Sequence, residues 1–281
     1  MNFILTIQCF DQQGIVRAVS TAISGAGGNI VESAQFVDQP TRLFSLRMNV
    51  DVEERRADNM HSELREELAR FDPIISFRPK NSRRRILVMA SLADHCLLDL
   101  NYHWQLGELP LDIVGVVSNH NDLRGFVEGA GLPFHLLPMT METKQQQELA
   151  LRQLVTSTQA DFVVLARYMQ ILSNELCRDF SGRIINIHHS FLPGFKGARP
   201  YRQAFQRGVK IIGATAHFVT PDLDEGPIID QDVARVSHAA QESELITIGR
   251  DVERRVLTRA VRLLAEDRVM LVGNRTVVFD Y

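Results

Sequence analysis

The stretch Ile86-Leu87-Val88-Met89-Ala90 decides the fold of most of this chain. It is short and wholly apolar, and two runs of the same kind follow at residues 113–117 and 162–166. Runs without polar alternation are typical of strands that are buried on both faces of a parallel sheet. Helix-forming stretches separate them, including residues 97–106 and 145–156. The alternation predicts right-handed crossovers and an α/β domain with an open, doubly wound, mostly parallel sheet.

The chain beyond these runs continues the same domain. Residues 211–220 and 228–233 predict a further pair of strands, and residues 242–266 predict a long amphipathic helix. We therefore assign residues 86–281 to one larger domain. Ligands of such sheets bind beyond the carboxyl ends of the strands, so polar residues at those ends are the candidates for function.

Residues 1–80 predict a second, smaller domain. A strand over residues 3–7 is followed by a helix between Gly14 and Gly25, and then by strands over 29–36 and 43–50. A helix over 53–71 and a strand over 74–77 complete the ferredoxin-like βαββαβ order.

Two local patterns give further predictions, one for a strand of the smaller domain and one for the boundary between the domains. In the third predicted strand, Leu46, Met48 and Val50 alternate with polar residues, which predicts one apolar and one polar face.

Residues 78–85 contain five basic side chains in eight positions. A nucleic-acid patch and a solvated linker are both open interpretations, and the negative net charge favours a basic linker over residues 81–85.

The composition is that of an ordinary globular protein. Of 281 residues, 45% are hydrophobic and 23% are charged, which excludes a disordered or fibrous chain. Lys and Arg number 31 against 34 Asp and Glu, and the net charge of −3 gives no support for nucleic-acid or membrane partners. No apolar run reaches the roughly 20 residues that span a bilayer.

The cysteines and the start of the chain lead us to expect a cytoplasmic protein. Cys9, Cys96 and Cys177 are odd in number, far apart and outside any CxxC spacing, which argues against a disulfide framework or a cysteine zinc site. The opening residues have no basic segment before their short apolar stretch, unlike a secretory signal.

The strongest chemical signal is the segment that runs from Asn186 through Ile187 to His188, at the end of an apolar strand. Side chains alternate along a strand, so Asn186 and His188 project to the same side. A later strand leads into an acidic loop that contains Asp224. An amide and a protonated imidazole stabilise an oxyanion, and a carboxylate orients and deprotonates a nucleophile. The three groups together suit the attack of water or an amine on a carbonyl.

Simpler interpretations remain open for these residues. A histidine at a strand end is often a hydrogen-bonded structural residue, and Asp222 and Asp224 are common turn formers. A zinc site built from His188, His189, His217 and Asp224 would require adjacent strand residues to face one metal. The chain also lacks an HExxH motif, so we expect no metal.

Residues 186–193, NIHHSFLP, and residues 223–227, LDEGP, together resemble the hallmark of the folate-dependent formyltransferases. The similarity spans roughly residues 85–281, and the two motifs together are highly specific. The resemblance implies a formyltransferase-like fold, a folate substrate and no metal or redox cofactor. It also implies that Asn186 hydrogen-bonds the formyl oxygen. His188, as an imidazolium, would stabilise the tetrahedral intermediate and protonate the folate nitrogen, and Asp224 would hold the water and raise the basicity of His188.

By the same resemblance, the pterin ring enters a mostly apolar slot. One side of the slot would be formed by Met169, Gln170, Ile171 and Leu172, and the other by Thr220, Asp222 and Leu223. Ordinary core packing remains an alternative for Met169 and Ile171.

The formyl acceptor decides between hydrolysis and transfer. Family members that formylate glycinamide ribonucleotide grip its phosphate with a Gly-Ser-Asn-type turn after the first strand of this domain. Residues 90–96 here, ASLADHC, contain no glycine, and Asp94 would repel a phosphate. His189 also stands where those members typically have Pro. Members that act on RNA carry a further carboxy-terminal domain.

We therefore expect hydrolysis of 10-formyltetrahydrofolate by water to tetrahydrofolate and formate, with the formate supplied to purine synthesis and the one-carbon pool kept in balance. Formyl transfer to an amine such as glycinamide ribonucleotide is one alternative. A catalytically inactive folate or amino-acid sensor is the other.

Residues 1–80 resemble an ACT domain, through the turn at residues 11–14 and the Asn that opens the second strand. The resemblance implies regulation by glycine or methionine, with Asp11, Gly14, Asn29 and Ile30 as the candidate contacts. ACT modules commonly pair side by side, so it also implies a homo-oligomer.

Overall fold

The computed structural model describes every residue except 141, 195–199 and 281. The chain divides into two compact units, Met1–Ser82 with Glu266–Tyr281, and Arg83–Ala265. Each unit has its own sheet and its own hydrophobic core.

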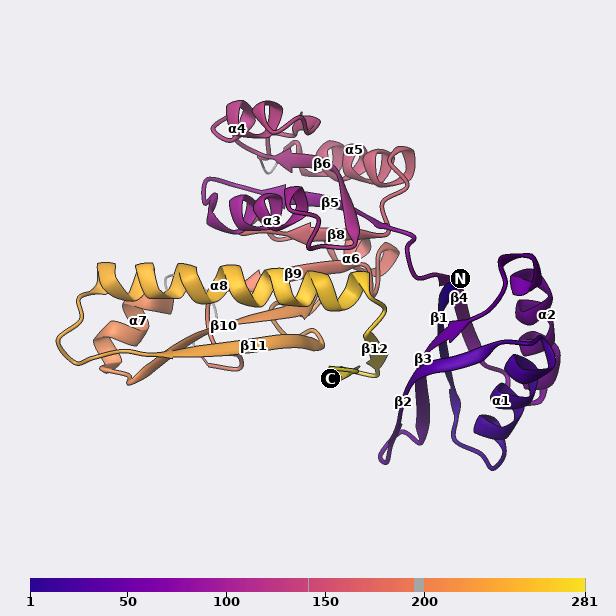
Figure 1. Ribbon diagram of the computed structural model, residues 1–281. Helices are drawn as coiled ribbons and strands as arrows, with labels where there is room; N and C mark the ends of the chain where they lie inside the picture. The colour runs from indigo at the N-terminus through magenta and orange to yellow at the C-terminus, as the bar shows by residue number, and fades with distance from the viewer. Residues whose placement is uncertain (141, 195–199, 281) are drawn as a thin grey trace. The chain divides into compact units, whose positions relative to one another are not determined.

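The first unit confirms the ferredoxin-like prediction. Its antiparallel sheet has the strand order β2-β3-β1-β4, and both α-helices lie on one face of it (Figure 1). The predicted helix over 53–71 is an α-helix with a short 3-10 helix at each end. The elements are β1 (Asn2–Phe10), α1 (Ile15–Gly25), β2 (Asn29–Asp38), β3 (Leu43–Asp51), η1 (Glu54–Arg56), α2 (Ala57–Leu68), η2 (Ala69–Phe71) and β4 (Ile74–Pro79).

Helix–sheet packing forms the core of this unit. Met60 and Leu64, four residues apart on α2, and Val19 on α1 are fully buried. They belong to the same apolar cluster as Leu46 and Met48 of β3, on the face that the sequence predicts to be apolar. The spacing of apolar residues along the helices and their alternation along β3 therefore specify the same helix–sheet interface.

The polar side chains of β3 are also buried, and residues 266–281 contribute a hairpin of β12 (Val269–Val272) and β13 (Arg275–Val278) to the same unit. Arg47 on β3 is 3% exposed, and its Nε and Nη2 donate to the Glu266 carbonyl oxygen at 3.2 and 3.1 Å. Gln8 Nε2 donates to the Leu271 carbonyl oxygen at 2.8 Å. The sequence interpretation placed these last residues in the larger domain, whereas the structure groups them with the first unit.

The connection between the two sheets is shorter than the expected linker over 81–85. β4 ends at Pro79, and Arg84 and Arg85 already belong to β5 (Arg84–Ala90). Arg84 Nη1 lies 3.2 Å from Asp161 Oδ1, and Arg85 Nε donates to the Thr158 carbonyl oxygen at 2.8 Å. These basic side chains have partners within the second unit, although Arg85 remains exposed.

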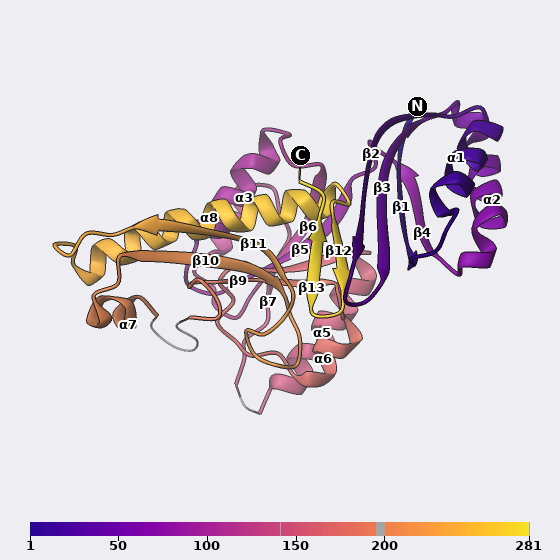
Figure 2. The ribbon, with the colours of Figure 1, turned by 90° about the horizontal axis from the view of Figure 1, so that it is seen from below.

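The second unit confirms the doubly wound α/β prediction. Its sheet has the order β11-β10-β9-β8-β5-β6-β7; β5 to β9 are parallel, and β10 and β11 run antiparallel. Helices α5 and α6 cover one face, and α3 and α8 cover the other (Figure 2). The remaining strands are β6 (Leu111–Ser118), β7 (Phe134–Leu136), β8 (Phe162–Leu165), β9 (Ile184–His188), β10 (Ile211–Phe218) and β11 (Ile228–Arg235). The helices are α3 (His95–Gln105), α4 (Arg124–Gly129), α5 (Lys144–Ser157), α6 (Asn174–Asp179), α7 (Pro200–Arg207) and α8 (Glu242–Ala265).

The strand order reverses between β5 and β8. From β5 the chain builds outward through β6 and β7, and then returns to build β8 and β9 on the other side. Connections leave such a point in opposite directions, which opens a crevice beyond the carboxyl ends of the strands. The segment that follows β8 and the end of β9 lie there, and they carry several of the predicted site residues.

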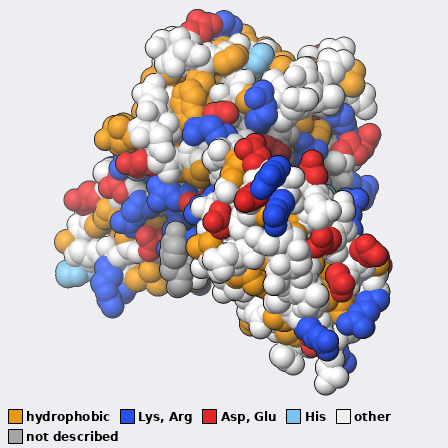
Figure 3. Space-filling view, turned by 45° about the vertical axis from the view of Figure 1, so that its right-hand side comes forward, with side chains coloured by type: hydrophobic (Ala, Val, Ile, Leu, Met, Phe, Trp, Pro, Cys, Tyr) orange, Lys and Arg blue, Asp and Glu red, His pale blue; other side chains and the backbone are white. Residues whose placement is uncertain are grey.

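The surface mixes charges of both signs. Figure 3 shows basic and acidic side chains interspersed over the visible face, around small apolar patches. This mixture agrees with the net charge of −3 and gives that face no field of a single sign. Within the described part of the chain, no helix has the length and apolar character needed to cross a membrane.

Candidate active site

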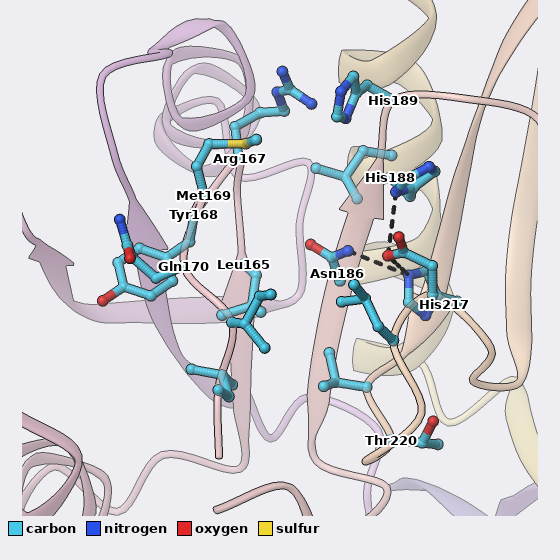
Figure 4. Close-up of a pocket in the computed structure, with 16 residues that line it drawn as sticks. Leu165, Arg167, Tyr168, Met169, Gln170, Asn186, His188, His189, His217 and Thr220 are labelled. Atoms are coloured by element: carbon cyan, nitrogen blue, oxygen red, sulfur yellow. Dashed lines mark hydrogen bonds and ion pairs between the residues drawn. The ribbon is translucent and has the colours of Figure 1, made fainter. Parts of the chain in front are cut away.

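A cavity of about 280 Å³ lies beyond the carboxyl ends of β8 and β9. Three segments line it: residues 165–172 after β8, residues 186–189 at the end of β9, and residues of the 217–224 segment at the end of β10 (Figure 4). The cavity therefore occupies the place that the sheet topology predicts for a ligand.

The structure brings Asn186, His188 and Asp224 together in this cavity. His188 Nδ1 lies 3.2 Å from Asp224 Oδ1, and both side chains are almost wholly buried. We assign the proton to Nδ1, because only a donor can satisfy the carboxylate. His188 Nε2 is buried and has no hydrogen-bond partner among the described residues. An unpartnered imidazole nitrogen in a cavity is placed to exchange a hydrogen bond or a proton with a ligand.

His217 orients the Asn186 amide. The two residues are partners in the antiparallel ladder between β9 and β10. His217 Nδ1 donates to the Phe218 carbonyl oxygen at 2.8 Å, so its Nε2 accepts the Asn186 Nδ2 hydrogen bond at 3.2 Å. Burial lowers the pKa of His217, which favours the neutral ring that this pattern requires. The sequence interpretation gave His217 only a zinc alternative, because the register between the two strands is not visible in the sequence.

A tight loop after β10 presents Asp224. Its φ of 58° is in the left-handed region, which costs a non-glycine residue about 1 kcal/mol. Two residues later, a Cβ on Gly226 would lie 1.7 Å from the Phe218 carbonyl oxygen, so this approach requires glycine. The Phe218 N–H donates to the Pro227 carbonyl oxygen at 2.9 Å and closes the loop.

Asp224 is ionised at neutral pH. Burial alone would raise the pKa of its carboxyl group, but the hydrogen bond and the charge from His188 outweigh burial and hold that pKa below its ordinary value. The ionised carboxylate therefore accepts the hydrogen bond from His188 Nδ1.

The residues predicted to hold the pterin divide into two groups. Met169, Ile171 and Leu223 line the cavity and are 56%, 63% and 56% exposed, which excludes core packing for Met169 and Ile171. The buried Leu172 lines the cavity too, as do Gln170 and Thr220.

Asp222 is not among the residues that line this cavity. Its carbonyl oxygen accepts a hydrogen bond from Thr220 Oγ1 at 3.0 Å, and its side chain is exposed. Asp222 therefore takes part in the turn, and its predicted contact with substrate stays a prediction.

Arg167 and His189 line the end of the cavity beyond His188, and the sequence interpretation assigned no function to Arg167. Arg167 Nε lies 3.3 Å from Glu253 Oε2 on α8. Burial, reinforced by the Arg167 charge, lowers the pKa of His189 to about 3. Nothing in the sequence marks Arg167, because its partner Glu253 lies far along the chain on another element.

The four candidate effector contacts lie in the first unit. Gly14 caps α1 with a φ of 94° and lines a shallow hollow beside α1 and α2, together with Arg17 and Arg70. Asp11, Asn29 and Ile30 are not among the residues that line it.

Comparison with known proteins identifies the class. Residues 84–261 match the family model described as formyl transferase, and the chain belongs to the formyl transferase family. A glycinamide ribonucleotide transformylase from Symbiobacterium toebii has a TM-score of 0.66 and 32% identity, over 71% of this chain and 95% of its own.

Within this family the chain groups with the formyltetrahydrofolate deformylases. The deformylase of Corynebacterium sp. (strain P-1) is 46% identical over 280 residues, which cover 99% of this chain and 98% of the relative. The crystal structure of the deformylase from Burkholderia mallei has a TM-score of 0.96 and 46% identity, over 99% of both chains. These similarities include the first unit as well as the second.

His189→Gln should reduce the loss of stability at low pH. An unfolded histidine takes up a proton near pH 6.5, but folded His189 does so only near about 3. Acidification below pH 6.5 therefore stabilises the unfolded state, and the effect grows until the pH reaches the folded pKa. Between pH 7 and 5 we expect the free energy of unfolding, from urea titration, to fall by about 2 kcal/mol less in the variant than in the wild type.

The control is His238→Gln, which replaces an exposed histidine and should keep the wild-type pH dependence. Equal pH dependence in all three proteins would contradict a neutral, buried His189.

Proposed function

We propose that the protein hydrolyses 10-formyltetrahydrofolate to tetrahydrofolate and formate. The observation that carries the proposal is the His188–Asp224 pair at 3.2 Å, which leaves His188 Nε2 unpartnered among the described residues and beside Asn186 in the cavity. Similarity to proteins named formyltetrahydrofolate deformylase over 99% of the chain supports the choice of substrate.

The cavity suits a folate with its formyl group next to the imidazole. The exposed side chains of Met169, Ile171 and Leu223 provide apolar surface for the flat pterin ring. Asn186 and His188 line the same cavity. A folate bound in this way places its formyl carbon where an oxyanion would meet two hydrogen-bond donors.

The proposed reaction begins with protonated His188 and ionised Asp224. The water oxygen bonds to the formyl carbon, and the carbonyl electron pair moves onto oxygen. Asn186 Nδ2 and His188 Nε2 donate hydrogen bonds to this oxyanion, while Asp224 accepts a proton from the water. The carbonyl then re-forms, and the bond from carbon to N10 breaks.

Product formation completes the proton balance. N10 takes the proton from His188 Nε2 and leaves as tetrahydrofolate, and formic acid loses its proton to solvent. Asp224 then releases its proton to solvent, and His188 Nε2 takes one up from solvent, which restores the starting state. Every proton is carried by a side chain or by water, so the proposed reaction needs no metal or redox cofactor.

The turn after β5 supports water over an amine as the acceptor. Ser91 Oγ donates to Asn119 Oδ1 at 2.7 Å and accepts the Met169 N–H at 3.2 Å. His95 is held by Glu253 at 2.8 Å. These side chains are committed to protein contacts, and the turn has no glycine that would let a phosphate approach the backbone.

We extend the proposal to the role in the cell. The protein would act in the cytoplasm, supply formate for purine synthesis and balance the one-carbon pool. The first unit would act as an ACT-type module that binds glycine or methionine and pairs with a second copy in a homo-oligomer. The ferredoxin-like βαββαβ order and the left-handed turn at Gly14 support this assignment.

Asp224→Asn should abolish most of the activity while the fold is kept. The amide cannot accept the proton from water or favour a charged imidazole, so we expect kcat for formate release to fall roughly 1000-fold with little change in KM.

Formate release from 10-formyltetrahydrofolate, with and without glycinamide ribonucleotide, is the measurement. Equal formate in both tubes supports hydrolysis, and formyl transfer to the amine or no turnover by the wild type would overturn it. Asp222→Asn is the matched control and should keep wild-type kcat.

Glycine or methionine should bind the first unit of the whole protein and change the rate of formate release. We expect titration calorimetry to detect binding of one of them, and Asn29→Ala to weaken it. Arg55→Ala, which replaces an exposed side chain on η1, should bind as the wild type does. If neither amino acid binds and neither changes the rate, the regulatory proposal is wrong.

A further inference from the structure

We propose that Arg167 and His189, with Arg167 held by Glu253, select water as the formyl acceptor. They close the end of the cavity beyond His188 to larger acceptors and hydrogen-bond the attacking water there. The inference rests on the proposed hydrolysis and adds the residues that determine its specificity.

The backbone of Arg167 is the first observation. Its φ of 64° is in the left-handed region, which glycine adopts freely and arginine adopts at a cost. Among the described residues, six that are not glycine have positive φ, and of these Arg167 and Asp224 line the cavity. A strained conformation persists where the surroundings fix it, and such residues cluster at functional sites.

The surroundings of Glu253 fix the Arg167 side chain. Glu253 is 1% exposed on α8 and accepts hydrogen bonds from His95 Nε2 at 2.8 Å and from Tyr201 Oη. Its ion pair with Arg167 Nε spans 3.3 Å. One turn earlier on α8, a Cβ on Gly249 would lie 2.1 Å from Tyr201 Oη, so glycine makes room for the tyrosine. Elements α3, α7 and α8 thus hold one guanidinium in place.

Within the described part of the chain, this arrangement leaves hydrogen-bond donors of Arg167 unused, because the contact of Nε with Glu253 is an ion pair without a hydrogen bond. Arg167 Nη1 is buried and has no hydrogen-bond partner among the described residues. Figure 4 shows the guanidinium and the His189 ring facing each other at one end of the cavity. Because the pKa of His189 is lowered to about 3, its ring is neutral and offers an acceptor nitrogen. A donor and an acceptor that face each other across a cavity suit one water molecule.

The same groups limit the size of the acceptor. The His189 ring centroid lies 5.2 Å from that of His188 and 6.0 Å from that of Tyr201. His189 therefore fills the space between the imidazole of His188 and α7. Arg167 and His189 lie together at one end of the cavity, so an amine whose substituent enters there would have to displace them. Arg167 and His189 occupy that space, and a water molecule needs none of it.

A metal site is a weaker explanation of the cluster. His95, Cys96 and Glu253 offer ligand atoms within 4.8 Å of one another. However, His95 Nε2 and Glu253 already share a hydrogen bond of 2.8 Å, and the Arg167 charge lies 3.3 Å from the same carboxylate. Burial raises the pKa of the Cys96 thiol well above its ordinary value, which opposes the thiolate that a metal requires.

The test uses Arg167→Gly in the whole protein. Glycine removes the guanidinium and relieves the left-handed backbone, and Glu253 keeps the His95 and Tyr201 hydrogen bonds. Formate and N-formylglycinamide are measured together from 10-formyltetrahydrofolate with excess glycinamide. The matched control is Arg42→Gly, the same substitution at an exposed residue with φ 55°. Arg167→Lys, which keeps a charge beside Glu253, is the second variant.

We expect Arg167→Gly to lower kcat for formate release roughly tenfold, with KM for the folate within about twofold. The share of formyl groups transferred to glycinamide should rise roughly tenfold, and Arg167→Lys should show a smaller rise. Arg42→Gly should match the wild type. A merely structural role would lower the rate without changing the product ratio.

Three results would overturn the inference: an unchanged product ratio in both variants, a raised KM with unchanged kcat, or equal effects of Arg42→Gly and Arg167→Gly. A wild type that releases no formate would instead overturn the proposed function.

Discussion

The proposed chemistry depends on the hydrogen bond from His188 Nδ1 to the Asp224 carboxylate. This contact fixes the ring tautomer, aims Nε2 into the cavity and keeps a negative charge beside the imidazole. Two unrelated structural features must be correct for it to form. β9 has to end at His188, and the loop after β10 has to place Asp224 in the left-handed region, which the close approach of Gly226 to Phe218 permits.

On our account, different residues around the cavity bind the folate and select the formyl acceptor. The apolar side chains after β8 suit the ring of a folate, and His217 fixes one N–H of Asn186. Arg167 and His189 lie together at one end of the cavity, where we propose that the acceptor arrives. The glycinamide ribonucleotide transformylase with the same fold shows that this sheet also serves enzymes named for formyl transfer. On our account, the acceptor end determines which reaction the shared catalytic groups perform.

Much of the fold could be predicted because the relevant signals are local. Apolar runs such as residues 86–90 specify buried parallel strands, and the period of two places Asn186 and His188 on one side. The same local signals could not distinguish Asp222, which forms the turn, from Asp224, which enters the cavity. The sequence did not predict that residues 266–281 belong to the first unit, because Arg47 and its partner Glu266 lie far apart in the chain. Arg167 was missed for a related reason: positive φ at an arginine leaves no trace in the residue pattern.

The most direct test of this account is a crystal structure of the protein with a 10-formyl folate analogue that cannot be hydrolysed. We expect the formyl oxygen within about 3 Å of both Asn186 Nδ2 and His188 Nε2, with the pterin ring against Met169 and Leu223. A formyl group directed away from His188, or a pterin ring bound at the Arg167 end of the cavity, would contradict the proposed role of the His188–Asp224 pair.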